Sequence, residues 1–238
     1  MKNLKVLAAI LPLISASCSD EYTGEASETA NVVNAITKKS GVTPNNALNP
    51  YDFTGQMHND ILADLENTDL NLRSIAFIAN AVDSVYSSNP GIISLSSGNP
   101  LLTARLPEIT AMVNNNNLLP SVLAASGMRT PARISLSTFI DSLTLDHDHP
   151  YDQIYNQIIS YEAAILANTE MNISEKRIIL TTTSVLRYSS YEKKRKDKDW
   201  ETSVTSIAAS IAGSDECPAL AVKMAATVGL CKNNNIIQ

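Results

Sequence analysis

Residues 49–65 read NPYDFTGQMHNDILADL, and we expect the chain to be organised around this stretch because it combines a strong helix start, a glycine inside the helix and an isolated histidine. Asn49 can cap the free backbone NH groups, and Pro50 suits the first helical position because it has no NH. Asp52 can accept a hydrogen bond from the Asn49 NH and oppose the positive end of the helix. The sequence therefore predicts that a helix begins here.

One face of this helix is predicted to be apolar. Its apolar residues recur at three- and four-residue spacing, so they share one side, and the acidic residues lie off that side. The apolar stripe contains Met57, Ile61, Leu62 and Leu65, whereas Asp60, Asp64 and Glu66 lie outside it. We expect this amphipathic helix to pack against the rest of the protein.

Gly55, His58 and Asn59 have two interpretations. A glycine inside a helix costs roughly 1 kcal/mol relative to alanine and usually allows another backbone to approach closely. His58 and Asn59, one turn later, can belong to a pocket for a ligand or metal. In the alternative, His58 is half-buried, bonds to a neighbouring carbonyl and fixes how the helix docks.

The motif Asn49-Pro50-Tyr51-Asp52-x-x-Gly55-x-x-His58-Asn59 resembles a pattern of uncharacterised, mostly helical exported proteins of the Bacteroidota and some Gram-positive bacteria. A fainter similarity covers residues 174–191. The resemblance implies kinship with these proteins and implies no activity. It makes the seven named motif residues the candidate binding surface.

The first seventeen residues have the form of an export signal. A basic end is followed by an apolar run, residues 6–14, that is too short to span a membrane, and then by small residues at 15–17. A small residue directly before Cys18 resembles a lipobox, with Ser15 where leucine is usual, and this implies cleavage before Cys18 and its lipidation. An ordinary signal peptide that releases a soluble protein is the alternative.

Residues 18–27 are small and polar and are predicted to form a flexible tether. Asp20 and Glu21, close behind the cysteine, resemble the signal that carries Bacteroidota lipoproteins to the outer face of the outer membrane. A solvated linker is the alternative. We therefore expect a lipoprotein held in the outer membrane through Cys18, on either the periplasmic or the external side.

The mature chain is acidic. The full sequence has 18 Lys and Arg against 24 Asp and Glu, and removing Lys2 and Lys5 with the signal leaves a net charge of −8. Nucleic acid is therefore not an expected partner. The 44% hydrophobic content suffices for a sizeable core. We predict a single domain over residues 28–238.

The placement of proline and glycine favours an all-α fold. Most of the ten prolines stand where a helix would open, and only eight glycines are available for turns. We predict a multi-helix bundle of about eight to ten helices. The candidate helices cover approximately residues 28–40, 50–66, 70–88, 101–116, 118–126, 134–145, 150–168, 173–193, 199–212 and 217–231.

Residues 177–185 are the most ambiguous stretch. Their β-branched side chains suit a strand, but an apolar and hydroxyl-bearing stripe with helical spacing continues beyond them for too long for a typical strand. We therefore predict a helix here.

The sequence contains few signs of catalytic chemistry. Asp146-His147-Asp148-His149 is the densest group of metal-ligand types, but it precedes a predicted helix, where Asp148 has an ordinary capping role. Ser190 and Lys193 match a Ser-x-x-Lys spacing without the companion motifs of penicillin-binding enzymes. Phosphate-binding, dinucleotide and nucleophile-elbow patterns are absent, and no cofactor is expected.

Two functions follow. The first is a non-enzymatic, lipid-anchored interaction or structural module of the cell envelope, whose partner is an unidentified envelope protein or small ligand. The second is an envelope hydrolase or metal-dependent enzyme centred on His58 with Asp146, His147 or His149. The second requires these side chains to converge in a concave pocket.

Cys217 and Cys231 form an even pair if Cys18 is lipidated. A continuous helix from Pro218 to Leu230 would separate their Cα atoms by roughly 21 Å, whereas a disulfide needs about 7 Å. We predict two free, mostly buried thiols.

Overall fold

The computed structural model describes residues 41–66, 68–70, 73–88, 100–145, 149–196 and 201–236, which all belong to one unit spanning residues 39–238. The predicted signal peptide, the tether and the candidate helix at 28–40 lie outside these residues. The described part contains nine α-helices and no strand, which confirms the predicted all-α bundle. No helix in this part is both long enough and apolar enough to cross a bilayer.

The observed helices follow the predicted ones, with bounds that differ by up to five residues. Helix α2 (Ile75–Ser88) begins five residues later than predicted. The predicted 101–116 segment divides into a short 3-10 helix and α3, and α5 begins four residues earlier than predicted, because Pro131 fits a first turn that needs no NH. The elements are α1 (Asp52–Glu66), α2 (Ile75–Ser88), η2 (Leu102–Arg105), α3 (Leu106–Asn114), α4 (Leu119–Ala125), α5 (Thr130–Leu145), α6 (Tyr151–Ala167), α7 (Ile173–Lys196), α8 (Glu201–Glu216) and α9 (Pro218–Asn233).

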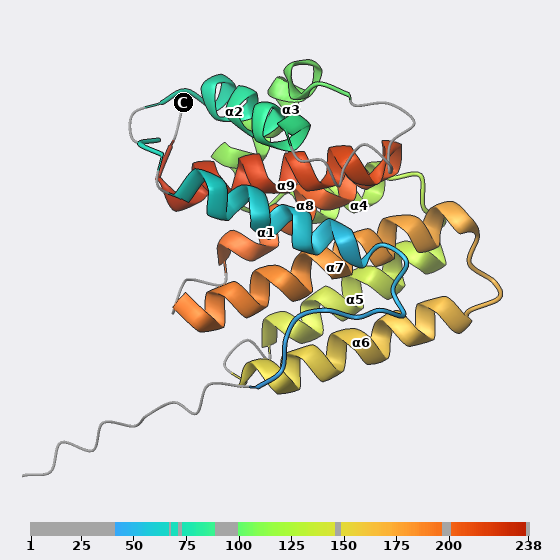
Figure 1. The fold of residues 1–238 in the computed structure, drawn as a ribbon. Coiled ribbons are helices and arrows are strands. Elements are labelled where there is room, and N and C mark those ends of the chain that lie inside the picture. The colour runs from blue at the N-terminus through green and yellow to red at the C-terminus, as the bar shows by residue number, and fades with distance from the viewer. Residues whose placement is uncertain are drawn as a thin grey trace, which may run out of the picture. The chain divides into compact units, whose positions relative to one another are not determined.

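Helices α7, α8 and α9 form the centre of this unit, with α2 and α3 on one side and α5 and α6 on the other (Figure 1). Two apolar cores result. One is built mainly from α1, α2, α3 and α9, and the other from α4, α5, α6 and α7. Helix α8 contributes Ala209 and Ala212 to the first core, and Ile207 and Ile211 to the second. The central helices are therefore enclosed, whereas the outer helices each keep a solvent-facing side.

Helix α1 has the predicted amphipathic character. Ile61 and Leu65 are buried, Met57 and Leu62 pack against the first core, and the three acidic residues off the stripe are exposed. Burial of such a stripe supplies most of the stability of a surface helix. The predicted stripe is confirmed.

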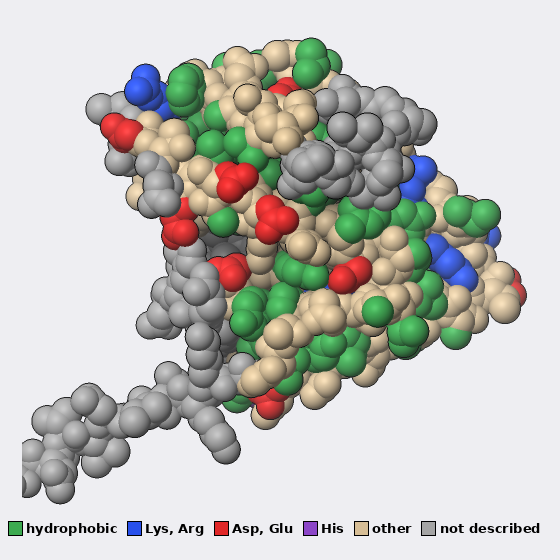
Figure 2. Space-filling view, in the orientation of Figure 1, with side chains coloured by type: hydrophobic (Ala, Val, Ile, Leu, Met, Phe, Trp, Pro, Cys, Tyr) green, Lys and Arg blue, Asp and Glu red, His purple; other side chains and the backbone are tan. Residues whose placement is uncertain are grey.

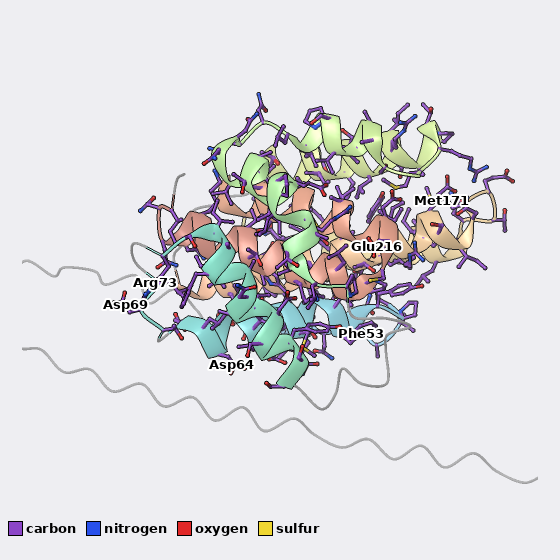
Figure 3. All side chains as sticks on the ribbon, turned by 90° about the horizontal axis from the view of Figure 1, so that it is seen from above. Phe53, Asp64, Asp69, Arg73, Met171 and Glu216 are labelled. Atoms are coloured by element: carbon purple, nitrogen blue, oxygen red, sulfur yellow. The ribbon has the colours of Figure 1, made fainter. Side chains whose placement is uncertain are left out.

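Leu70 and Arg73, which precede α2, make one contact in the core and one at the surface. Arg73 lies beside Asp69 (Figure 3), donates from Nε to the Asp69 carbonyl oxygen at 3.5 Å, and has its guanidinium 4.9 Å from the ring centroid of Phe77. Leu70 is buried in the first core. These contacts position α2 for packing on α9.

Both described cysteines are free, as predicted. Cys217 is half-buried directly before α9, and Cys231 is buried within its last turns. Because α9 is continuous between them, the two thiols lie too far apart to form a disulfide.

Candidate functional site

Helix α7 is buried on all sides from Ile178 to Ser190, although much of this segment consists of serine and threonine. Helices α1, α6, α8 and α9 pack around it. Short hydroxyl side chains allow close packing and can bond within their own helix, as Ser190 Oγ does to the Leu186 carbonyl oxygen at 2.7 Å. The helix predicted for residues 177–185 is confirmed, and the strand alternative is wrong.

At Gly55, α1 and α7 are in close backbone contact. An added Cβ at Gly55 would lie 2.7 Å from the carbonyl carbon of Ser184 and would overlap both the carbonyl oxygen of Ser184 and the ring of Tyr188. The Gly55 NH donates to Ser184 Oγ at 3.0 Å, and that hydroxyl donates to the Asp52 carbonyl oxygen at 2.9 Å. Glycine is therefore required here for space, as the sequence predicted.

Asn49 caps α1 and also attaches it to two other helices. Its Oδ1 accepts the backbone NH of Tyr51 at 2.8 Å, which is a capping bond. Its Nδ2 donates to Glu162 Oε1 at 2.8 Å and to the Leu180 carbonyl oxygen at 3.0 Å. One buried asparagine thus joins the start of α1 to α6 and α7. Pro50 beside it is exposed.

Asp52 has a different partner from the one predicted. Its carboxylate accepts the Asn46 NH at 3.1 Å, not the Asn49 NH, and Oδ1 also pairs with Arg187 Nη2 at 2.7 Å. The Tyr188 hydroxyl donates to Oδ2 at 3.3 Å. Burial and the neighbouring Asp52 carboxylate raise the pKa of Tyr188 to about 12, so this phenol remains a donor at neutral pH.

Arg187 and Glu162 form an ion pair at 3.3 Å, and both side chains are 0% exposed. Glu162 also accepts from Asn46 Nδ2 at 2.6 Å, Asn49 Nδ2 at 2.8 Å and Thr183 Oγ1 at 2.9 Å. Buried charges persist when they are paired and hydrogen-bonded, and removing one partner of such a pair costs about 3–5 kcal/mol. This pair therefore holds α6 and α7 together.

His58 and Asn59 continue the same contact one turn later. His58 is only 2% exposed, so it is buried where the docking interpretation made it half-buried. Its Nδ1 lies 3.1 Å from Oδ1 of Asn59, the amide carbonyl oxygen of the neighbouring residue. Asn59 Nδ2 donates to the Tyr188 carbonyl oxygen at 3.1 Å. Asn59 thus links the buried His58 to α7.

The motif residues therefore converge on α7, so residues 49–59 and residues 174–191 are in contact with each other. Asn49, Asp52, Gly55 and Asn59 each bond to α7. Tyr51 is half-buried against the second core. The hydrogen-bonding groups of these four residues therefore serve to hold α1 on α7.

The structure describes only part of the two candidate groups for catalytic chemistry, the Asp146–His149 cluster and the Ser190/Lys193 pair. Asp146, His147 and Asp148 lie outside the described residues, and His149 is exposed just before α6. Within the part of the chain that the structure describes, no three His, Cys, Asp or Glu side chains are grouped to hold a metal ion. Ser190 is buried and bonded within α7, so it is not a free nucleophile.

Sequence reasoning missed two buried ion pairs. Arg187 and Glu162 make the first, and in the second Lys223 Nζ of α9 donates to Asp83 Oδ1 of α2 at 2.8 Å and to the Pro100 carbonyl oxygen at 2.5 Å. One signal could have revealed Glu162: it follows Ile154 and Ile158 at four-residue spacing, which places a charge on the buried stripe of α6.

Carboxylates lie across the middle of the face that α1 crosses, and Lys and Arg side chains lie at its edges (Figure 2). On α1 itself, Asp60 and Asp64 stand one turn apart, and partial burial together with the charge of Asp64 raises the pKa of Asp60. The middle of this face therefore carries carboxylates, and its edges carry the cations.

Comparisons of the chain with protein-family models, with curated proteins and with solved structures gave no match.

Proposed function

We propose that this protein is a lipid-anchored helical module of the cell envelope that acts by interaction or structural support and not by catalysis. The N-terminal pattern supports the anchor, because an apolar run and small residues directly precede Cys18. The resemblance of the motif to exported Bacteroidota proteins supports the same location. Asp20 and Glu21 support display at the outer membrane.

This proposal rests mainly on the contacts that the motif side chains make within the protein. Asn49, Asp52 and Asn59 bond to α6 or α7, and His58 is buried among them. A catalytic or binding group must reach its substrate, usually in a concave site with convergent polar groups. Side chains that hold two helices together instead make the protein rigid, and a rigid surface suits the binding of a partner.

The net negative charge of the protein favours partners that are basic or neutral where they make contact. A net charge of −8 after removal of the signal and the central carboxylates in Figure 2 oppose nucleic acid and favour a partner with a basic or neutral contact surface. The proposed partner is therefore an envelope protein or a small ligand, held near the membrane by the lipid on Cys18.

The anchor is tested by replacing Cys18 with alanine in the native host. Wild-type protein should enter the detergent phase and the membrane fraction, since acyl chains contribute about 0.8 kcal/mol per buried methylene. The Cys18→Ala variant should remain uncleaved or become soluble. Cys217→Ala is the matched control, because it removes a described free thiol far along the chain. Unchanged partitioning of Cys18→Ala would refute lipid anchoring.

The non-enzymatic role is tested on the same purified protein. Its metal content, measured by inductively coupled plasma mass spectrometry, should be substoichiometric and should not change in His58→Gln. A stoichiometric metal ion that is lost in His58→Gln and in His149→Ala would instead support the envelope enzyme centred on His58.

A further inference from the structure

Residues 43–49, which we name the strap, lead into α1 and lie across α6 and α7 (Figure 1). The Pro44 carbonyl oxygen accepts from Arg187 Nη1, and the Asn45 carbonyl oxygen accepts from the Tyr155 hydroxyl at 2.9 Å. Asn46 Nδ2 donates to Glu162 Oε2 at 2.6 Å. These three partners of the strap are thus more than a hundred residues away in the sequence, at one polar seam between α6 and α7, whereas the Asn46 NH donates to the nearby Asp52 carboxylate.

The strap has polar attachments and little apolar packing. Thr43, Asn45, Ala47 and Leu48 are exposed, and Leu48 is 76% exposed despite being the largest apolar side chain of the strap. None of the strap residues belongs to either apolar core. Only Asn49, at its inner end, is buried. Segments with few buried apolar contacts open at low free energy while the core remains folded.

Water can replace most of what the strap provides. The two carbonyl groups and the Asn46 amide would exchange protein partners for water, and such an exchange changes the free energy only modestly for each bond. Arg187 and Glu162 would keep each other, and Arg187 would keep Asp52. Helix α1 would remain attached through Gly55 and Asn59. Opening of the strap therefore leaves the helical body intact.

We propose that the strap is a latch that fixes where the N-terminal segment leaves the helical body, and that its residues 43–48 open as a unit from the Arg187–Glu162–Tyr155 seam while the buried Asn49 stays in place. Opening frees residues 43–48, which extend the reach of the preceding chain by about 20 Å at 3.3–3.6 Å per residue. For the lipid-anchored protein proposed above, this changes how far the body can stand from the membrane. The latch itself does not depend on that anchor.

The latch is tested by hydrogen–deuterium exchange of the full mature chain carrying Cys18→Ala, with two variants that weaken it from opposite sides. Asn46→Asp replaces the amide that donates to Glu162 with a carboxylate of the same shape, which repels it. Tyr155→Phe removes the hydroxyl that bonds to Asn45 and leaves the strap sequence unchanged. Asn45→Asp is the control, because it adds the same charge to the adjacent, exposed side chain.

Exchange of the strap amides should increase roughly two- to twelvefold in Tyr155→Phe, the shift expected for one lost hydrogen bond, and more in Asn46→Asp. Asn45→Asp should exchange like the parent chain, and the amides of α7 should be unchanged in all three. Strap exchange that stays at the parent level in both latch variants would overturn the proposal. So would a joint rise in the strap and α7, because the strap would then unfold only with the body. Neither result depends on lipidation, so failure of the latch is distinct from failure of the proposed function.

Discussion

Replacing Gly55 with alanine places a methyl group in a close contact between α1 and α7. The new Cβ would lie 2.7 Å from the Ser184 carbonyl carbon and would overlap the carbonyl oxygen of that residue and the ring of Tyr188. The obstructing group on Ser184 is backbone inside a fully buried helix, so it cannot rotate away as the end of a flexible side chain could. The two helices must therefore move apart.

The expected cost combines three contributions. Overpacking of a well-packed interior costs about 1–3 kcal/mol. Separation of the helices also weakens the hydrogen bond from the Gly55 NH to Ser184 Oγ, now 3.0 Å long, which is worth about 1 kcal/mol. Alanine returns roughly 0.5–1 kcal/mol because it is the better helix former. The net loss of unfolding free energy is about 1–3.5 kcal/mol, or about 2–14 °C in Tm for a domain of this size.

Urea unfolding monitored by circular dichroism measures this loss directly. Gly229→Ala is the matched control, since an added Cβ there meets only Ser206 Oγ, at 3.2 Å, and we expect its stability to change by less than about 1 kcal/mol. Gly55→Leu should be more destabilising than Gly55→Ala because it adds volume to the same contact. If Gly55→Ala is as stable as wild type, α1 and α7 do not meet at Gly55 and the proposed reason for this glycine is wrong.

Two further predictions concern ionisable groups. Hydrogen bonds from Arg129 lower the pKa of Glu175 from 4.5 to about 2, so its charged form stabilises the fold above pH 4.5 and this contribution disappears as the pH falls toward 2. Glu175→Gln should therefore lose less stability than wild type over that range in an acid titration followed by circular dichroism, and parallel curves would contradict this assignment. Burial raises the pKa of Cys231 to about 12 while Cys217 is half-buried, so a thiol reagent in mildly alkaline buffer should label Cys217 first. Mass spectrometry of the unreduced, alkylated protein should find no link between them, and a crosslink would show that α9 is not one continuous helix.

The helices could be predicted because their signals are local. Proline at a helix start and apolar residues at three- and four-residue spacing depend on the backbone and on neighbours within one or two turns. These signals located α1, with its stripe around Ile61 and Leu65, and α6 within one residue of its observed ends. The length of α9 also decided that Cys217 and Cys231 stay free, since a continuous helix fixes the distance between them.

The partners of the motif could not be predicted, because they come from distant parts of the chain. Asp52 has a local use as a capping residue, and the sequence favours that use, but the structure gives it Arg187, 135 residues later. Glu162 and Arg187 are charged and would ordinarily be assigned to the surface. They are buried because each lies where the other can neutralise it.

Local sequence patterns were thus sufficient to predict that the described chain is helical, where most helices begin and end, which face of α1 is apolar, and that Gly55 needs space. The three-dimensional packing was needed to see that the serine- and threonine-rich part of α7 is completely enclosed, that Asn49 and Asp52 bond to α6 and α7, and that the strap rests on the Arg187–Glu162 pair. The two kinds of feature depend on interactions of different range along the chain. Helix formation and amphipathic spacing are set within a few residues, whereas burial of a polar side chain becomes favourable only when a partner from elsewhere in the chain supplies its hydrogen bonds and countercharge.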